Sequence, residues 1–332
     1  MSNKLQFTRY LYNKDEVELT LLEAILKNKN FNEIYFWTLE LYKSNDPEEL
    51  WQFIFKIYYD FYYVSYPNFI KKIVTYYNKS KKNNKIKYVL FVIYNLKRAS
   101  KNIDFNIFLS RTYFSSRLTY IIKNIDLTSF NGNLHQKLLS FAIKTKKNDL
   151  IAYYLKKVIN LKNIEEFLQI EFDISLKNND PYNNKFHKYL VLCLNIPKIK
   201  KKFIFKKVPD NAYKDVEEKI NQIERIHYKI LKTKRLYAIS DKIGCFSLVR
   251  SNYLLSKEFW YHWEFHAFKS LVWKNRFNKC KIKVNKKKKE IEFLDDDEME
   301  AFYEKYGYEP DEQTKEIQEK SIKKIKSTSF DS

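Results

Sequence analysis

Glycine is almost absent from this chain. Three glycines, Gly132, Gly244 and Gly307, occur among 332 residues, together with six prolines. Strand-rich folds use glycine in their tight turns, so a chain with so few is better suited to helices joined by short connections. Apolar residues make up 45% of the sequence, which is enough to bury a large core. We therefore expect a folded, mainly helical protein.

Helix signals recur along the first half of the chain. The clearest is Asp46-Pro47-Glu48-Glu49, which offers an N-cap acid, a proline at the first helical position and two acids at the positive end of the helix dipole. Asp15 followed by Glu18 is typical of a capping box. Further helices, one of them capped by Asn148, are expected near residues 86–98, 115–125, 134–147, 149–160 and 163–176. Such a row of short helices predicts an irregular α-α superhelix or bundle.

Composition changes near residue 178, and the rest of the chain predicts a smaller α+β region with one or two β-hairpins. A helix is expected over residues 210–231, and an acidic run beginning at Asp295 should start a helix that reaches Tyr306. The hairpin strands are expected at 235–239 with 245–249, and at 281–284 with 290–293. The predicted divisions are a helical domain over 1–178, a basic connecting segment over 179–208, an α+β region over 209–309, and a polar helical or disordered tail over 310–332.

The cysteines and apolar runs bear on the compartment. Cys193, Cys245 and Cys280 are odd in number and widely spaced, which argues against a disulfide framework and favours a reducing environment. The N-terminus has no apolar segment of signal-peptide length, and the strongest apolar run, over residues 88–94, is too short to span a bilayer. The sequence therefore predicts a cytosolic protein without a membrane partner.

The densest group of chemically active side chains lies at residues 259–266, where five aromatic residues surround His262, Glu264 and His266. Two histidines four residues apart share one face of a helix and are candidate ligands for a metal. The metalloprotease pattern, however, requires an acid directly after the first histidine, and Trp263 occupies that position. The favoured interpretation is an aromatic helix packed into a core. A metal-dependent hydrolase or nuclease is kept as an alternative.

Other catalytic patterns are missing from the sequence. The scarcity of glycine excludes phosphate-cradling loops of the Walker or dinucleotide type, and no Gly-x-Ser-x-Gly elbow occurs. The remaining histidines, His135, His187 and His227, are isolated along the chain. The acids from Asp295 to Glu300 are interpreted as a solvated helix start. We expect a protein without enzymatic activity, catalytic residues or cofactor.

The net charge of +22, from 62 basic and 40 acidic residues, is typical of a protein that binds nucleic acid. Eight of the basic residues are arginine, and this small share predicts phosphate contacts with little base specificity. The abundance of lysine, asparagine, isoleucine, phenylalanine and tyrosine also matches A/T-rich codons, so genome composition is a competing explanation. The candidate contacts are a cluster at 81–87 and the residues Lys198, Lys200, Lys201, Lys202, Lys206, Lys207, Lys286, Lys287, Lys288 and Lys289.

Phe203 and Phe205 alternate with the lysines of the first run. A strand at this place would offer both phosphate contacts and surfaces for base stacking. An ordinary half-buried strand with a charged outer face is the competing interpretation. A nucleic-acid role further predicts that the lysine clusters converge on one face of the protein.

Several phrases of the sequence share a distinctive aromatic texture. They are the block over residues 261–273, the run Phe302-Tyr-Glu-Lys-Tyr-Gly-Tyr-Glu-Pro-Asp-Glu-Gln313, and Leu39-Glu-Leu-Tyr42 followed by Ile57-Tyr-Tyr-Asp-Phe-Tyr62. Together they resemble an uncharacterised protein family of large nucleocytoplasmic DNA viruses, of the mimivirus-like kind. The resemblance implies expression in a virus factory of the host cytoplasm, and packaging in virions as a further expectation. It transfers no catalytic motif.

Two functions are consistent with these features. The leading hypothesis is a non-enzymatic viral protein whose helical region presents a surface to a protein partner, with exposed aromatic residues as anchors. The alternative is a basic accessory factor that binds nucleic acid during viral transcription, replication or genome packaging.

Overall fold

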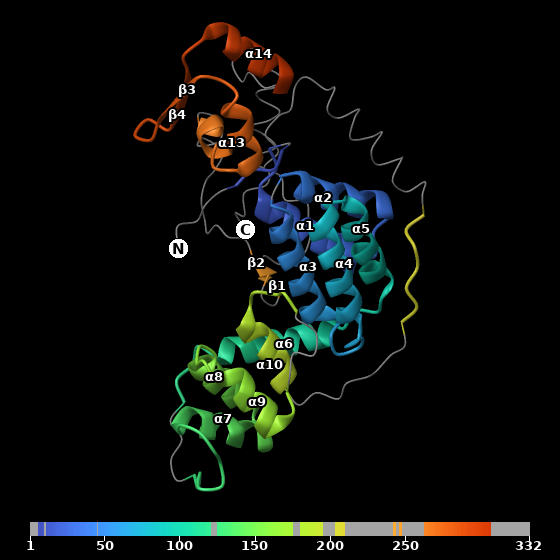
Figure 1. Ribbon diagram of the computed structural model, residues 1–332, viewed down its shortest axis with the longest axis vertical. Helices are drawn as coiled ribbons and strands as arrows, with labels where there is room; N and C mark the ends of the chain where they lie inside the picture. Colours follow the sequence, from blue (N-terminus) through green and yellow to red (C-terminus); the bar gives the residue numbers. More distant parts are fainter. Residues whose placement is uncertain are drawn as a thin grey trace, which may run out of the picture. The chain divides into compact units, whose positions relative to one another are not determined.

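The computed structural model describes residues 6–9, 11–44, 46–120, 125–174, 180–194, 203–209, 242–243, 246–247 and 262–306. Most of these residues lie in helices, and the two sheets among them have two strands each (Figure 1). The predicted fold class, mainly helical with a smaller α+β part near the C-terminus, is confirmed. Within the described residues, no helix is both long enough and apolar enough to cross a membrane.

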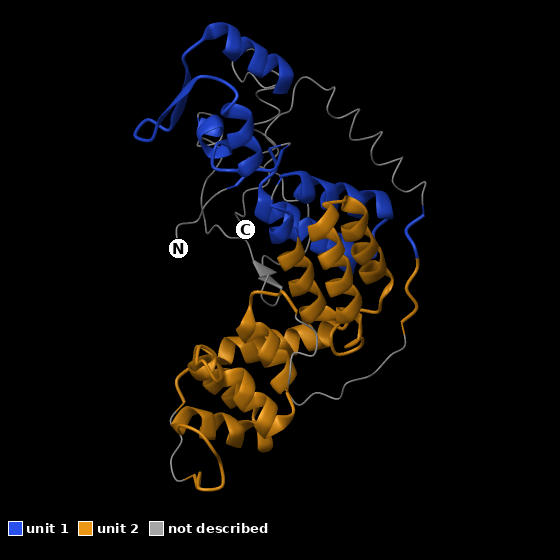
Figure 2. Cartoon of the chain, in the orientation of Figure 1, with its two compact units in different colours: residues 1–50, 207–242, 246–332 blue, residues 51–206, 243–245 orange. Residues whose placement is uncertain are grey.

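The chain forms two compact units, coloured separately in Figure 2. The first comprises residues 1–50, 207–242 and 246–332, and the second comprises 51–206 and 243–245. The predicted boundaries at 178, 208 and 309 differ from this division and stay predictions. The difference arises because the first residues of the chain pack with its C-terminal third.

The first unit holds two N-terminal helices and the α+β part. Its elements are α1 (Lys14–Leu26), α2 (Phe31–Ser44), a helical segment at 262–267, α13 (Leu271–Phe277), β3 (Ile282–Asn285), β4 (Glu290–Phe293) and α14 (Asp296–Tyr306). Phe7 and Leu11 are buried in one cluster with Trp273, Phe277 and Phe302. The N-terminal segment therefore completes a core whose other members come from the C-terminal third.

Hydrogen bonds hold the N-terminal segment in this core. The Phe7 backbone N–H donates to Ser270 Oγ at 2.7 Å, and the Trp273 indole N–H donates to the Thr8 carbonyl at 2.9 Å. The Arg9 guanidinium is buried and pairs with the Glu40 carboxylate of α2 at 2.8 Å. A buried charge needs such a partner, so this ion pair also fixes the segment against α2.

The predicted hairpin near the C-terminus is present. β3 and β4 are antiparallel, with Ile282 opposite Phe293 and Val284 opposite Ile291. The turn between them consists of residues 286–289, and Lys289 adopts a positive φ of 58°. α14 begins beside the acidic run, as expected, because Asp295 Oδ1 accepts the Glu298 backbone N–H.

The second unit is a row of helices, to which α3 contributes most of its length. Its elements are α3 (Pro47–Phe61), α4 (Phe69–Asn83), α5 (Ile86–Arg98), α6 (Ile103–Ser115), α7 (Leu134–Lys144), α8 (Asn148–Val158), α9 (Ile164–Phe172) and α10 (Lys185–Cys193). The predicted N-cap of α3 is confirmed, since Asp46 Oδ1 accepts the Glu48 backbone N–H at 2.9 Å. Apart from these helices, the short β1 (Lys242–Ile243) pairs with β2 (Phe246–Ser247), so that β1 lies C-terminal to the strand predicted at 235–239.

Four local predictions were wrong. Asn13, not Asp15, is the N-cap of α1, and Lys147, not Asn148, precedes α8. The helix predicted at 115–125 lies instead at Ile103–Ser115, because Asn102 caps it by accepting the Phe105 backbone N–H. Residues 203–209 form neither a strand nor a helix. The helix predicted over 210–231 and the tail over 310–332 lie outside the described residues.

Candidate functional site

The histidine cluster of the sequence serves packing within the first unit. His262 Nδ1 lies 3.0 Å from the Lys289 carbonyl of the β3–β4 turn, and Glu264 accepts a hydrogen bond from the Tyr303 hydroxyl at 3.2 Å. His266 is buried, with Lys269 Nζ 3.4 Å from its Nδ1. Across the described residues, no three His, Cys, Asp or Glu side chains are grouped as a metal site would require.

A buried polar group in the second unit involves a histidine that stands isolated in the sequence. His187 Nε2 lies 2.7 Å from Asp60 Oδ1 and its Nδ1 lies 2.9 Å from the Tyr182 hydroxyl. Asp60 and His187 are fully buried, and Tyr182 is nearly so. Because no solvent or substrate reaches these groups, their contacts anchor α10 to the end of α3.

Two lysines of the β3–β4 hairpin, Lys281 and Lys283, lie close to acids. Lys283 lies 3.8 Å from Glu292 on the opposite strand, and Lys281 lies 3.7 Å from Asp295. Lys286, Lys287 and Lys288 are exposed at the tip of the turn. The positive charge of this hairpin is therefore partly balanced by its own carboxylates.

The α4–α5 hairpin of the second unit has no acid of its own. Between Phe61 and Ile103 the sequence contains no aspartate or glutamate. We call residues 61–103 the acid-free stretch. Its basic residues are Lys71, Lys72, Lys79, Lys81, Lys82, Lys85, Lys87, Lys97, Arg98 and Lys101.

Aromatic rings line the same hairpin. The Tyr76 ring of α4 stacks on Phe91 of α5 at 4.0 Å between centroids, and Phe91 stacks on Phe205 at 6.3 Å. Tyr88 lies 6.1 Å from Tyr76. We call these four partly exposed rings, Tyr76, Tyr88, Phe91 and Phe205, the aromatic row.

Lysine ammonium groups lie over this row. Lys79 Nζ is 5.1 Å from the Tyr76 ring centroid, Lys87 Nζ is 5.4 Å from Tyr88, and Lys72 Nζ is 5.9 Å from Phe205. These are cation–π distances, which leave the ammonium hydrogens open to a further anion. None of the three lysines has a carboxylate partner among the described residues.

Asn95 of α5 attaches Lys206 to this hairpin. Its fully buried side-chain amide pairs with the Lys206 backbone, accepting the N–H at 3.0 Å and donating to the carbonyl at 3.0 Å. Arg98 donates to the Ile204 carbonyl at 3.2 Å. Lys206 is exposed next to Phe205 of the aromatic row, and Lys207, which is also exposed, belongs to the first unit. Two lysine clusters far apart in the sequence thus meet on one structure, whereas Lys198, Lys200, Lys201 and Lys202 lie outside the described residues.

Two lysines near the end of α5 have lowered pKa values. Burial lowers the pKa of the Lys97 ammonium. Burial, and then repulsion from Lys97, lower the pKa of Lys101 below its usual 10.5. The fold therefore disfavours the charged form of both groups.

The chain was compared with protein families, curated proteins and solved structures. None of them matches it. What the protein binds is therefore inferred from its geometry and charge.

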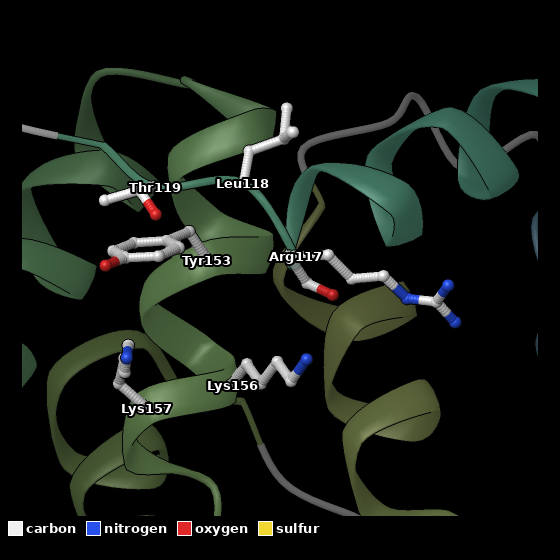
Figure 3. A pocket seen from close by; sticks show the side chains of 7 residues that line it. Arg117, Leu118, Thr119, Tyr153, Lys156 and Lys157 are labelled. Carbon is white, nitrogen blue, oxygen red and sulfur yellow. The ribbon is translucent and has the colours of Figure 1, made fainter.

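A second basic surface lies between α6 and α8. A hollow of about 360 Å³ is lined by Ser116, Arg117, Leu118, Thr119, Tyr153, Lys156 and Lys157, none of which is acidic. Figure 3 shows Thr119 above the Tyr153 ring, with Lys156 and Lys157 extending from the next turn of α8. Lys157 Nζ is 5.4 Å from the Tyr153 ring centroid.

An exposed apolar row on α6 leads to this hollow. Ile103, Ile107 and Phe114 are 50%, 46% and 59% exposed, and Leu118, which lines the hollow, is 44% exposed. Spacings of four and seven residues place Ile103, Ile107 and Phe114 along one side of α6, and Leu118 follows just after the end of this helix. We call these four residues the α6 outer face.

Sequence reasoning named some of these groups and missed others. Lys206, Lys207 and the cluster at 81–87 are among the residues that the sequence predicts. The absence of acids from the acid-free stretch is also visible in the sequence and is a further signal for this surface. The role of Asn95 leaves no local signal, because its partner lies 111 residues away. The hollow also brings together two separate segments, so no motif marks it.

Proposed function

We propose that this protein binds nucleic acid through the α4–α5 hairpin and the attached residues 203–206. The observation that carries the proposal is the convergence of Lys72, Lys79 and Lys87 on the aromatic row, within a stretch that has no acid. Lysines supply the salt-dependent attraction to phosphates. Partly exposed rings offer stacking surfaces to unpaired bases.

The chemistry favours single strands and little base specificity. Single-strand binding sites combine a basic surface with aromatic side chains, and both are present here. Arg98, the one arginine of the stretch, is engaged with the Ile204 carbonyl, so bidentate base contacts are not its main role. The resemblance to large DNA virus proteins would place this activity in a cytoplasmic virus factory, as an accessory to transcription, replication or genome packaging.

The test is binding to labelled single- and double-stranded DNA and RNA over a salt series, measured by fluorescence anisotropy. We expect tighter binding to single strands, with log K falling against log salt by about 0.7 for each phosphate contact. The triple variant Lys72→Glu/Lys79→Glu/Lys87→Glu should reduce the slope by roughly 2 and weaken binding by about tenfold or more.

The matched control is Lys286→Glu/Lys287→Glu/Lys288→Glu, which makes the same charge change in the β3–β4 turn. Its affinity should stay close to that of the wild type. Equal losses for the two variants would mean that net charge alone drives binding, and the proposed site would be rejected.

A second candidate function is supported by the α6 outer face. Exposed apolar side chains in a continuous row are characteristic of surfaces that bind another protein. This candidate corresponds to a helical protein-interaction scaffold. It is tested by the loss of partner binding when Ile107 and Phe114 are replaced by serine.

A further inference from the structure

α6 is apolar on two opposite sides. Phe105 and Leu109 are buried in the second unit, whereas Ile107 and Phe114 point the other way and are about half exposed. A row of apolar side chains on one side of a helix normally packs against another element. The outer face of α6 is therefore suited to burial against a further element.

The surroundings of this face are mainly basic. Arg111 is exposed on α6, and Arg117 and Lys156 extend from the hollow at its C-terminal end. None of these three side chains has a carboxylate partner among the described residues. Asp104 is the acid that α6 itself carries. Charge complementarity thus favours an acidic occupant.

We propose that the α6 outer face and the adjoining hollow bind an amphipathic helix of a protein partner, with apolar residues on one side and carboxylates flanking them. The apolar side would cover Ile103, Ile107 and Phe114, as in other helix-on-surface complexes. Carboxylates beyond it would meet Arg117 and Lys156. This inference rests on the second candidate function and specifies its partner.

A second copy of the chain matches the apolar spacing but not the charge. The outer face is symmetric about the point between Ser110 and Arg111, so an antiparallel copy would set Ile107 against Phe114 of its partner. The same symmetry brings the two Arg111 side chains close together near the axis. A net charge of +22 on each copy opposes the contact further.

The test uses two synthetic helical peptides titrated into the full chain by fluorescence anisotropy. Both carry leucines at spacings of four, seven and four residues. Their remaining positions are mainly glutamate in one peptide and mainly lysine in the other. Sedimentation velocity of the protein without peptide reports whether it self-associates.

We expect saturable binding of the acidic peptide and none of the basic peptide. Ile107→Ser/Phe114→Ser should weaken binding by about tenfold or more, because two apolar side chains leave the interface. Arg117→Gln/Lys156→Gln should weaken binding and make it less sensitive to salt, because two cationic side chains that attract the acidic peptide are removed. Ile170→Ser, at an apolar residue of α9 that is 71% exposed, should leave binding unchanged.

Two outcomes overturn the inference and differ in what they imply. If the basic peptide binds as well and depends on Ile107 and Phe114, the face binds proteins but does not select acidic ones. If neither peptide binds, both the docking of an acidic partner helix and the second candidate function are rejected. If the protein self-associates through this face, only the docking of an acidic partner helix is rejected.

Discussion

The α4–α5 hairpin and the β3–β4 hairpin both carry dense lysines, but only the second has carboxylates within its own sequence. Lys281 and Lys283 lie within ion-pair distance of Asp295 and Glu292, respectively. Exposed pairs of this kind add little to stability, yet they reduce the positive potential that an approaching anion meets. Lysine count alone is therefore a poor guide to a binding surface, and the position of the acids decides it.

The binding surface of the α4–α5 hairpin depends first on Asn95, which holds Lys206 on it. Asn95→Leu removes both hydrogen bonds to Lys206 and leaves its backbone groups unpaired. The free energy of unfolding should fall by about 1–3 kcal/mol. Nucleic-acid affinity should fall as well, because Lys206 is no longer fixed next to the aromatic row.

Urea unfolding and anisotropy measure the two effects. Asn78→Leu, at an exposed position of the same hairpin, is the control and should change neither quantity appreciably. Full affinity in a destabilised Asn95→Leu protein would show that Lys206 does not contribute.

Acids placed in the acid-free stretch should make it behave like the β3–β4 hairpin. Asn78→Asp/Asn83→Asp adds two carboxylates of nearly the same shape to exposed positions of α4. Affinity for single-stranded DNA should fall by about fivefold to tenfold, equal to roughly 1–1.4 kcal/mol, through repulsion of phosphates. Asn78→Ser/Asn83→Ser controls for the lost amides, and an equal loss there would contradict the electrostatic explanation.

The reverse change should turn the β3–β4 hairpin into a weak binding surface. Glu290→Gln/Glu292→Gln removes the acids of β4 and leaves the turn lysines unbalanced. In the background of the Lys72, Lys79 and Lys87 charge reversal, affinity should rise about twofold to threefold, the size expected of exposed ion pairs. No change in affinity would mean that the shape of the α4–α5 hairpin matters beyond its charge.

The smallest effect concerns the cost of unbalanced charge. Because the folded-state pKa of Lys101 is lowered, the folded protein binds fewer protons than the unfolded chain at pH values between that pKa and 10.5. The contribution of this group to stability thus rises with pH through that window. Lys101→Gln should raise the free energy of unfolding at neutral pH by no more than roughly 0.5 kcal/mol. The melting temperature should rise slightly with it.

Thermal melts at several pH values check this sign. The gain from Lys101→Gln should shrink as the pH approaches 10.5, where the wild-type lysine loses its charge. Lys85→Gln, in the link between α4 and α5, is the control. A gain that grows with pH would contradict burial and repulsion as the cause.

Local signals predicted much of this fold. α5 lies at the expected residues, and α3, α14 and the β3–β4 hairpin begin near their predicted starts, because caps, proline and alternation are read from neighbouring residues. The helix predicted at 115–125 was wrong, because the cap at Asn102 starts α6 at Ile103 instead. The union of Phe7 with Phe302 could not be foreseen, since a contact between distant residues leaves no periodicity in either segment.

The candidate site also combines features that the local sequence predicts with contacts between distant residues that it does not predict. The lysines at 81–87, 206 and 207 were identified from composition, and the pairing of Asn95 with Lys206 was not. The three residues at 262, 264 and 266 drew attention by their density. Their neighbours in the structure are the β3–β4 turn and Tyr303. These contacts could not be predicted, because they join residues 27 and 39 positions apart in the sequence.

The core that joins Phe7 to the C-terminal third has a consequence for synthesis. Ser270, which accepts the Phe7 backbone N–H, follows it by 263 residues. At about 5–20 residues per second, the ribosome needs on the order of tens of seconds to complete that interval. Phe7 and Leu11 leave the ribosome long before their partners are synthesised. During this time they are exposed apolar side chains to which chaperones can bind. The translation rate and the supply of chaperones should therefore affect the yield of correctly folded first unit. The effect should be smaller for the helices of the second unit, which lie between the two ends of the first unit in the sequence.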